Sequence, residues 1–307
     1  MRIIGAGLAG LLSGNVLRRF QPEILEAQSS LPNNHSALLR FRTEICSKAT
    51  GVPFRKVEVH KAIMHNGDLR NSSTIALNNA YSLKVTGQVS ARSIINVETS
   101  ERFVAPDNFI SQMAASVSIR YGQPLSSEEI LKRDGSSDPI VSTIPMPAMM
   151  KMVGWENPPP FDFRTIWSVR CRLKACEVYQ TIYYPDRETN QYRASITGDL
   201  LIIECLKEPS QAEASQLAYN VLADFGIDGE NGEIEIVAQK YGKLTTTNPH
   251  TCRQFILFLT DRYRIYSLGR FAVWKQILLD DVCKDISIIE RLIEYRGCYQ
   301  AALEQSK

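Results

Sequence analysis

The residues best suited to chemistry in this chain stand at its start, in a glycine-spaced turn between a strand and a helix. Gly5, Gly7 and Gly10 follow the β-type run Arg2-Ile3-Ile4, and an apolar segment with helical character covers 11–17. Gly5 suits a tight strand-to-helix turn, Gly7 lets backbone amides approach a pyrophosphate, and Gly10 lets the helix pack closely on the strand. The first turn of the helix would then present N–H donors and a partial positive charge to the phosphates.

An acidic side chain ends the next predicted strand. The run Pro22-Glu-Ile-Leu-Glu26 places Glu26 where a carboxylate can accept hydrogen bonds from an adenosine ribose. A glycine motif alone is a weak signal, but strand, glycines, helix, strand and acid in this order predict a dinucleotide site. The residues expected to form it are Gly5, Ala6, Gly7, Leu8, Ala9, Gly10, Glu26 and Ala27.

Composition narrows the possible classes of protein. The chain has 307 residues, 44% of them hydrophobic and 22% charged, which is typical of globular proteins with one or two domains. A net charge of +2 is too small to predict binding to nucleic acid or to an anionic membrane. The most apolar run, 140–153, is interrupted by Pro145, Pro147 and Lys151, so we expect no membrane span.

Cysteine and histidine spacing points away from metal sites and disulfides. The seven cysteines are scattered without a CxxC pair, and the four histidines have no ligand-like spacing. This pattern favours reduced thiols in a cytoplasm and predicts no metal. Because the glycine motif begins so close to Met1, we also expect no secretion or transit signal.

The pattern of hydrophobic residues changes after the first βαβ unit. Alternating segments predict strands over 56–60, 81–85, 117–121, 139–144, 165–173, 178–184, 191–205 and 264–268. Helical spacing predicts helices over 108–116, 211–225 and 272–282.

These β-rich stretches interrupt a pattern that would otherwise alternate strands with helices. We therefore expect an α/β protein with a discontinuous Rossmann-like dinucleotide-binding domain and an inserted β-rich α+β substrate domain. The predicted dinucleotide-binding domain covers 1–50, 105–150 and 250–307, and the substrate domain covers 51–104 and 151–249.

Three segments together resemble the two-dinucleotide-binding-domain flavoproteins, which include amine oxidases, protoporphyrinogen oxidase and UDP-galactopyranose mutase. They are Gly5-Ala-Gly-Leu-Ala-Gly10 with Glu26, Asp138-Pro-Ile-Val-Ser-Thr-Ile-Pro145, and Ile265-Tyr-Ser-Leu-Gly-Arg-Phe-Ala-Val-Trp274. The resemblance implies FAD as cofactor. It also implies that Gly269, Arg270 and Phe271 contact the distal part of the cofactor and that Arg40 binds its pyrophosphate, for which a planar guanidinium is well suited.

Candidate substrate residues lie in the β-rich domain, where arginines stand beside aromatic residues. Arg170, Tyr184, Tyr192 and Arg193 could line a pocket for an anionic or planar substrate, with Tyr192 and Arg193 pointing to opposite faces of one strand. The catalytic residues stay unassigned, because the sequence contains no recognisable nucleophile–base pair or carboxylate dyad. Flavin chemistry requires neither.

The resemblance implies an FAD-dependent oxidoreductase that oxidises an amine or amino-acid-like small molecule by hydride transfer to flavin N5. Three alternatives stay open: a mutase-like flavoenzyme acting on a sugar nucleotide without net redox change, a flavoenzyme acting on modified nucleobases, and a non-catalytic dinucleotide-binding protein. The expected partner is a small-molecule substrate, and we expect no membrane. Nucleic acid is not predicted by the small net charge, but it stays open as a partner.

Overall fold

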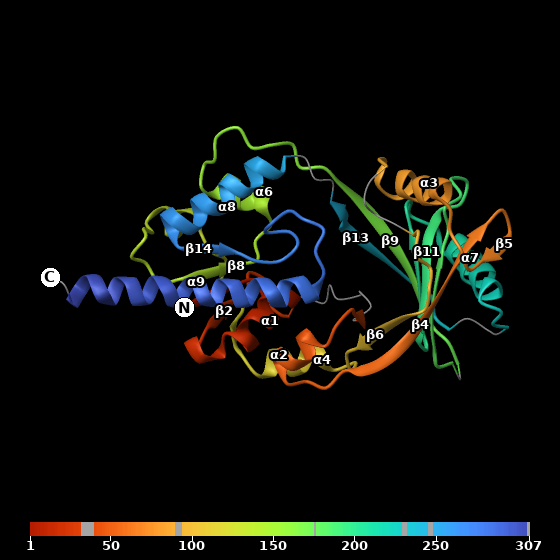
Figure 1. Ribbon diagram of the computed structural model, residues 1–307, viewed down its shortest axis with the longest axis horizontal. Coiled ribbons are helices and arrows are strands. Elements are labelled where there is room, and N and C mark those ends of the chain that lie inside the picture. Colours follow the sequence, from red (N-terminus) through yellow and green to blue (C-terminus); the bar gives the residue numbers. More distant parts are fainter. Residues whose placement is uncertain (32–39, 90–93, 175, 229–231, 245–247, 306–307) are drawn as a thin grey trace. The chain divides into compact units, whose positions relative to one another are not determined.

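The computed structural model describes residues 1–31, 40–89, 94–174, 176–228, 232–244 and 248–305. The chain forms two compact units (Figure 1). The first combines residues 1–55, 103–161 and 246–307, and the second combines 56–102 and 162–245. The predicted fold class, a discontinuous α/β unit with an inserted β-rich unit, is therefore confirmed.

The first unit is built on a sheet of five parallel strands in the order β14-β8-β1-β2-β7. From β1 the chain passes to β2 on one side, and β8 lies on the other side of β1. The carboxyl end of β1 is thus a topological switch point, the position where open α/β sheets bind ligands. The strands are β1 (Arg2–Ile4), β2 (Glu23–Leu25), β7 (Ser118–Arg120), β8 (Ile140–Ser142) and β14 (Ile265–Ser267).

Helices pack against this sheet and exclude water from it. Ile3 of β1 shares one hydrophobic core with four of these helices. They are α1 (Leu8–Val16), α2 (Ile45–Thr50), α4 (Phe109–Ala115) and α9 (Leu279–Gln305). Figure 1 shows α8 (Pro249–Tyr263) beside β14, with which it is in contact. The unit also contains a 3-10 turn (Arg18–Phe20), β3 (Arg40–Phe41), α5 (Ser127–Leu131) and α6 (Met146–Met152).

The second unit is a mixed sheet with the strand order β13-β9-β12-β11-β10-β4. Its neighbours pair antiparallel except β10 and β4, which run parallel. The elements are β4 (Arg55–His65), β5 (Asp68–Arg70), α3 (Ile75–Thr86), β6 (Ser100–Val104), β9 (Phe163–Arg172), β10 (Val178–Tyr183), β11 (Gln191–Gly198), β12 (Leu200–Cys205), α7 (Gln211–Asp224) and β13 (Glu235–Leu244).

One face of this mixed sheet is apolar. The other, the polar face, carries polar side chains beside a second apolar cluster that includes Tyr81 and Val85 of α3. Helix α7 begins with a capping box of Ser210 and Glu213, then buries Ala214, Ala218 and Val221 against the apolar face. Because side chains alternate along a strand, the intervening residues lie on the opposite face. There Thr181 and Ser195 are buried, and their hydroxyl oxygens lie 3.0 Å apart.

Two of the secondary-structure predictions are wrong. Residues 81–85, expected as a strand, belong to α3, whose start is capped by the Thr74 hydroxyl accepting from the Leu77 N–H at 3.2 Å. Leu77, Tyr81 and Val85 repeat every four residues and are buried on one side of this helix. The apolar residues that suggested a strand over 81–85 therefore belong to the buried side of a helix.

The helix expected over 272–282 is also wrong. Residues 270–274 form turns, with Val273 N donating to Gly269 O at 3.1 Å and Lys275 N donating to Arg270 O at 3.0 Å. Trp274, in a left-handed conformation with φ +47°, buries its indole against Phe161. Helix α9 begins only at Leu279, where the Asp281 carboxylate accepts from the preceding Leu278 N–H.

No helix in the part of the chain that the structure describes is long and apolar enough to cross a membrane. The cytoplasmic location inferred from the cysteines stays a prediction.

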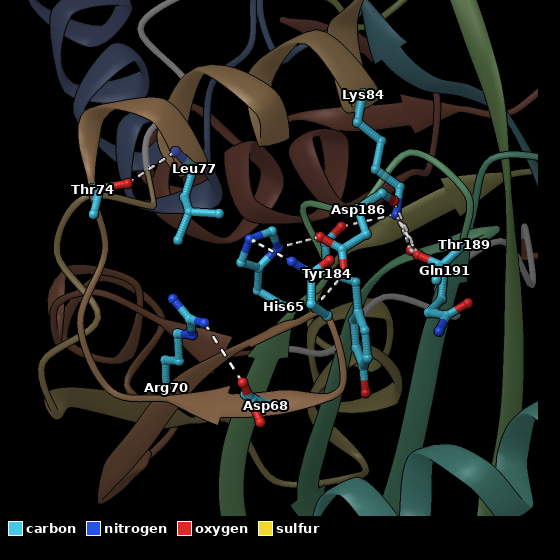
Figure 2. Close-up of polar contacts among 11 residues, drawn as sticks. His65, Asp68, Arg70, Thr74, Leu77, Lys84, Tyr184, Asp186, Thr189 and Gln191 are labelled. Carbon is cyan, nitrogen blue, oxygen red and sulfur yellow. Dashed lines mark hydrogen bonds and ion pairs between the residues drawn. The ribbon is translucent and has the colours of Figure 1, made fainter.

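A buried lysine fastens α3 to the connection between β10 and β11. Lys84 is 7% exposed, and its ammonium donates to Tyr184 O, Thr189 Oγ1 and Gln191 O at 2.9, 2.8 and 2.6 Å (Figure 2). Burial lowers the pKa of Lys84 to about 8, although the charge of Asp186 opposes this shift. Asp186 Oδ1 also lies 2.5 Å from His65 Nδ1 in β4. One polar cluster therefore links α3, β4 and the connection between β10 and β11.

We expect the wild type to gain stability between about pH 8 and about pH 10 relative to Lys84→Met. The folded pKa of Lys84, about 8, lies below the value of about 10.4 for an unfolded chain, so the unfolded state binds more protons in this window and stability rises with pH. The full gain is about 3 kcal/mol. At neutral pH the free energy of unfolding of the variant should be about 1–3 kcal/mol lower than that of the wild type, because the buried oxygens lose their hydrogen-bond donor. Urea unfolding of both proteins across this pH range measures the difference, and parallel curves would contradict the prediction.

Candidate nucleotide site

The turn after β1 is folded tightly onto the start of α1. Gly5 has φ +94°, and its N–H donates to Leu25 O at 2.8 Å. A Cβ added to Gly10 would lie 1.9 Å from the carbonyl oxygen of Gly5, so a side chain at position 10 would push the helix off the turn. A Cβ added to Gly7 would have no atom within 4 Å, so the turn is open at Gly7.

The first turn of α1 has donors that the helix itself does not use. Gly7 is the N-cap residue and supplies no side-chain cap, and the Leu11 N–H makes its hydrogen bond to Gly7 O at 2.9 Å. The amides of Leu8, Ala9 and Gly10 therefore have no acceptor within the helix. With no acidic residue in this turn, the helix start suits an anion such as a pyrophosphate.

Glu26 is held rigidly at the end of β2. The residue is 6% exposed, and its Oε2 accepts from the Ala6 N–H at 2.7 Å while its Oε1 accepts from the Gln28 N–H at 2.9 Å. A carboxylate oxygen has more than one lone pair, so each retains capacity for a ligand hydroxyl. Glu26 thus joins the glycine turn to β2, while the neighbouring Ala27 is exposed.

The distant segment after β14 reaches this same turn. Gly269 has φ +89°, and a Cβ added to it would lie 2.9 Å from the Cβ of Ala9. Leu268 N donates to Ser142 O and Met146 N donates to Phe271 O, both at 2.9 Å. The segment is therefore fixed between β8 and the start of α1, and the structure brings together the two ends of the predicted cofactor site.

Two predicted cofactor residues, Arg270 and Arg40, have surroundings that do not include the glycine turn in the contacts described below. Arg270 is half-buried, and its guanidinium lies 5.5 Å from the ring centroid of Phe271. Arg40 is half-buried in β3, opposite Val104, while its neighbour Phe41 enters the core beside Phe54. Their contacts with a cofactor stay predictions.

Thr143 is a further residue of this site to which the sequence analysis assigned no role. Its N–H and Oγ1 both donate to Ile4 O, at 3.0 and 2.7 Å, and a Cβ at Gly5 would lie 2.3 Å from Oγ1. Thr143 therefore supports the glycine turn from β8. Its position directly after the buried run Ile140-Val141-Ser142, at the carboxyl edge of the sheet, is the sequence signal that could have identified it.

The candidate arginines of the second unit are all paired with carboxylates. Arg170 NH1 lies 3.1 Å from Glu235 Oε2, and Arg193 Nε contacts Glu204 Oε2. The neighbouring Arg172 pairs with Asp199 at 2.5 Å. This face of the sheet is therefore closer to neutral than its arginines alone would suggest.

Tyr192 and Arg193 act on the same carboxylate, so the prediction that they point in opposite directions is wrong. Tyr192 OH donates to Glu204 Oε1 at 2.9 Å, while Arg193 contacts the other oxygen. The register shifts between Gln191 and Arg193, and such a bulge interrupts strict alternation. Lys243 Nζ lies 4.8 Å from the centroid of the buried Tyr192 ring.

Tyr184 lies on the α7 side of the sheet. The residue is 2% exposed, and its hydroxyl donates to Asp224 Oδ2 in α7 at 2.9 Å. Burial and the Asp224 charge raise the pKa of Tyr184. This environment gives no support for a substrate contact. In the described parts of both units, no group of three or more His, Cys, Asp or Glu side chains could hold a metal ion.

Comparison with known proteins relates the chain to others by structure. No protein-family model matches it, and no curated protein matches its sequence. A reduced UDP-galactopyranose mutase superposes with a TM-score of 0.66 at 12% identity, covering 96% of this chain and 93% of the other. A protein assigned as a protoporphyrinogen oxidase from Exiguobacterium sp. 255-15 gives 0.62 at 12% identity, covering 96% and 98%. The flavin-dependent brominase Bmp2 gives 0.55 at 11% identity, covering 96% and 79%.

The chain has the fold of the two-dinucleotide-binding-domain flavoproteins. The resemblance drawn from three short segments is thus confirmed at the level of the fold.

We expect Gly10→Ala and Gly7→Ala to differ sharply in stability. The new Cβ at position 10 would overlap a backbone oxygen, which should lower the free energy of unfolding by about 3 kcal/mol or more. At position 7 the Cβ enters open space and φ is −68°, so stability should change by less than about 1 kcal/mol. Urea unfolding of the two variants tests this, and equal losses would show that the turn and helix are not in close contact.

Proposed function

We propose that the chain binds FAD and is an FAD-dependent oxidoreductase. The observation that carries the proposal is the meeting of the glycine turn, Glu26 and Gly269 in one unit, although Gly269 is far from the others in sequence. A cofactor that occupies this site would have its pyrophosphate at the first amides of α1 and its adenosine ribose at Glu26. Gly269, Arg270 and Phe271 would contact its distal half, and Arg40 would add positive charge.

The residues present fit such a group in shape and charge. The turn is open at Gly7, the helix start provides donors without an acidic side chain, and Glu26 is fixed as an acceptor. When bound, FAD would supply a hydride acceptor, which no amino-acid side chain provides. The protein's own contribution is to bind and orient the cofactor and to orient the substrate.

For the substrate, we propose an amine or amino-acid-like small molecule. Arg170, Arg172 and Arg193 are each paired with a carboxylate, so the polar face of the second unit offers little net positive charge for a polyanion. A neutral or cationic amine is compatible with this charge balance. Glu204 is central, because its two oxygens fix Tyr192 and Arg193.

A mutase-like reaction on a sugar nucleotide is the second candidate. It is favoured by the Gly269-Arg270 pair and by the TM-score of 0.66 to a UDP-galactopyranose mutase. The neutralised arginines argue against it, since the substrate would bring a diphosphate that needs positive charge. Activity that appears only after chemical reduction of the flavin, with no oxidant consumed, would favour this candidate.

The test is anaerobic mixing of the FAD-loaded protein with a panel of amines, amino acids and UDP-galactopyranose. We expect at least one amine to bleach the visible absorbance of the bound flavin. Glu204→Gln should slow that bleaching about tenfold or more, equivalent to about 1.4 kcal/mol, because the freed Arg193 charge repels a cationic amine. Glu235→Gln is the matched control: it also breaks an arginine pair, but its side chain is 63% exposed, and it should have a smaller effect.

Two results would contradict the proposal. If no amine reduces the flavin while the flavin remains bound, the assigned substrate class is wrong. If Glu204→Gln and Glu235→Gln have the same effect, Glu204 has no special role in orienting the substrate.

A further inference from the structure

Two cysteines from opposite ends of the chain meet inside the first unit. Cys46 lies in α2 and Cys283 in the second turn of α9, 237 residues further along, and the two helices are in contact. Both are buried, at 0% and 2% exposure, and their sulfurs lie 2.8 Å apart. The Cys46 thiol also lies 3.5 Å from Leu279 O.

The backbone around the two thiols is held in place by an independent interaction. Asp280, in the first turn of α9, is 5% exposed and accepts hydrogen bonds from the residues that lead into α2. Its Oδ1 accepts from Thr43 N at 2.8 Å and Thr43 Oγ1 at 2.7 Å, and its Oδ2 accepts from Arg42 N at 3.2 Å. The segment that carries Cys46 is therefore aligned on the helix that carries Cys283 without any bond between the sulfurs.

The surroundings of this pair fit a dithiol better than a metal site. Among the cysteines that the structure describes, Cys46 and Cys283 alone have contacting sulfurs. Around them the described residues supply no third ligand of the His, Cys, Asp or Glu type for a metal ion. A covalent bond between sulfurs needs a separation of about 2.05 Å, so the two sulfurs, now 2.8 Å apart, would have to approach by about 0.8 Å.

We propose that Cys46 and Cys283 form a dithiol site that small-molecule disulfides convert into an intrachain disulfide closing the first unit. The bond would join the first and third stretches of a unit whose chain is interrupted by the whole of the second unit. A cross-link between such distant residues removes much conformational freedom from the unfolded chain, so it should stabilise the unit strongly.

The chemistry is two successive thiol–disulfide exchanges. One cysteine thiolate attacks a sulfur of oxidised glutathione, forming a mixed disulfide and releasing one glutathione thiol. The second cysteine then attacks the protein sulfur of that mixed disulfide and releases the second glutathione thiol. The two protein thiols are oxidised, one glutathione disulfide is reduced, and the two protons leave on the two glutathione molecules.

The environment also predicts the rate. The hydrogen bond with Cys283, together with burial, raises the pKa of the Cys46 thiol well above its usual range. Because the thiolate is the attacking species, exchange should be slow at neutral pH and faster as the pH rises.

The experiment incubates the full FAD-loaded chain with oxidised glutathione at alkaline pH, with a dithiothreitol-treated sample in parallel. Free thiols are then alkylated under denaturing conditions, and peptides are mapped by mass spectrometry. We expect a cross-linked peptide joining Cys46 to Cys283, two hydrogens lighter than the sum of its parts. We also expect the oxidised protein to melt roughly 5–15 °C above the reduced one.

Variants separate this site from general oxidation. Cys46→Ala and Cys283→Ala should each abolish the melting difference, whereas Cys205→Ala, which changes a buried cysteine of the second unit, should retain it. If both cysteines of the wild type are recovered alkylated, or carry glutathione separately without a cross-link, the proposal is overturned. Wild-type peptide mapping gives this answer even where a variant fails to fold, and cofactor content, measured separately, reports on the proposed function.

Discussion

The first unit depends on how closely α1 approaches the turn that follows β1. Gly10 faces the carbonyl of Gly5, and a Cβ there would lie 1.9 Å from that oxygen. This contact sets the direction of α1, and with it the direction of the amides at Leu8 and Ala9. The same close fit continues at Gly269, which meets the Cβ of Ala9. A helix displaced outward would lose both its position over the sheet and its meeting with the segment after β14.

Around this contact, hydrogen bonds convert a flexible glycine turn into a rigid one. Thr143, directly after β8, donates to Ile4 O, and Glu26, directly after β2, accepts from the Ala6 N–H. The turn is thus supported from both neighbouring strands while its surface at Gly7 stays open. This rigidity favours binding, because a preformed site loses little conformational entropy when the ligand binds, and less of the interaction energy is offset.

The sequence predicted the first unit well because its signals are local. Glycine spacing, short β-branched strands and a terminal acid each act over a few residues, so β1, β2, β7, β8 and β14 were all anticipated. The convergence of Gly269 with the opening turn required a family resemblance, since no local pattern encodes a long-range contact. The helix cap at Thr74 is a local signal that was missed because 81–85 was predicted as a strand. The bulge at Tyr192 and the late start of α9 were missed because register shifts and the burial of Trp274 depend on tertiary packing.

The second unit illustrates why charge cannot be read from residue types alone. Arginines that suggest an anion site in the sequence meet carboxylates on adjacent strands, because Arg193 pairs with Glu204 across β11 and β12. Sheet register, which the sequence does not reveal, decides this. The arginines taken alone therefore overstate the positive charge of this face.

The proposed function requires that one extended dinucleotide occupies the first unit. The most direct measurement is the visible absorption spectrum of the purified chain after incubation with FAD and removal of the excess, followed by chromatography of what denaturation releases. The account predicts a yellow protein that releases intact FAD, about one per chain, and a Gly7→Ala variant that folds but retains far less. A wild-type protein that stays colourless and releases no flavin would contradict it.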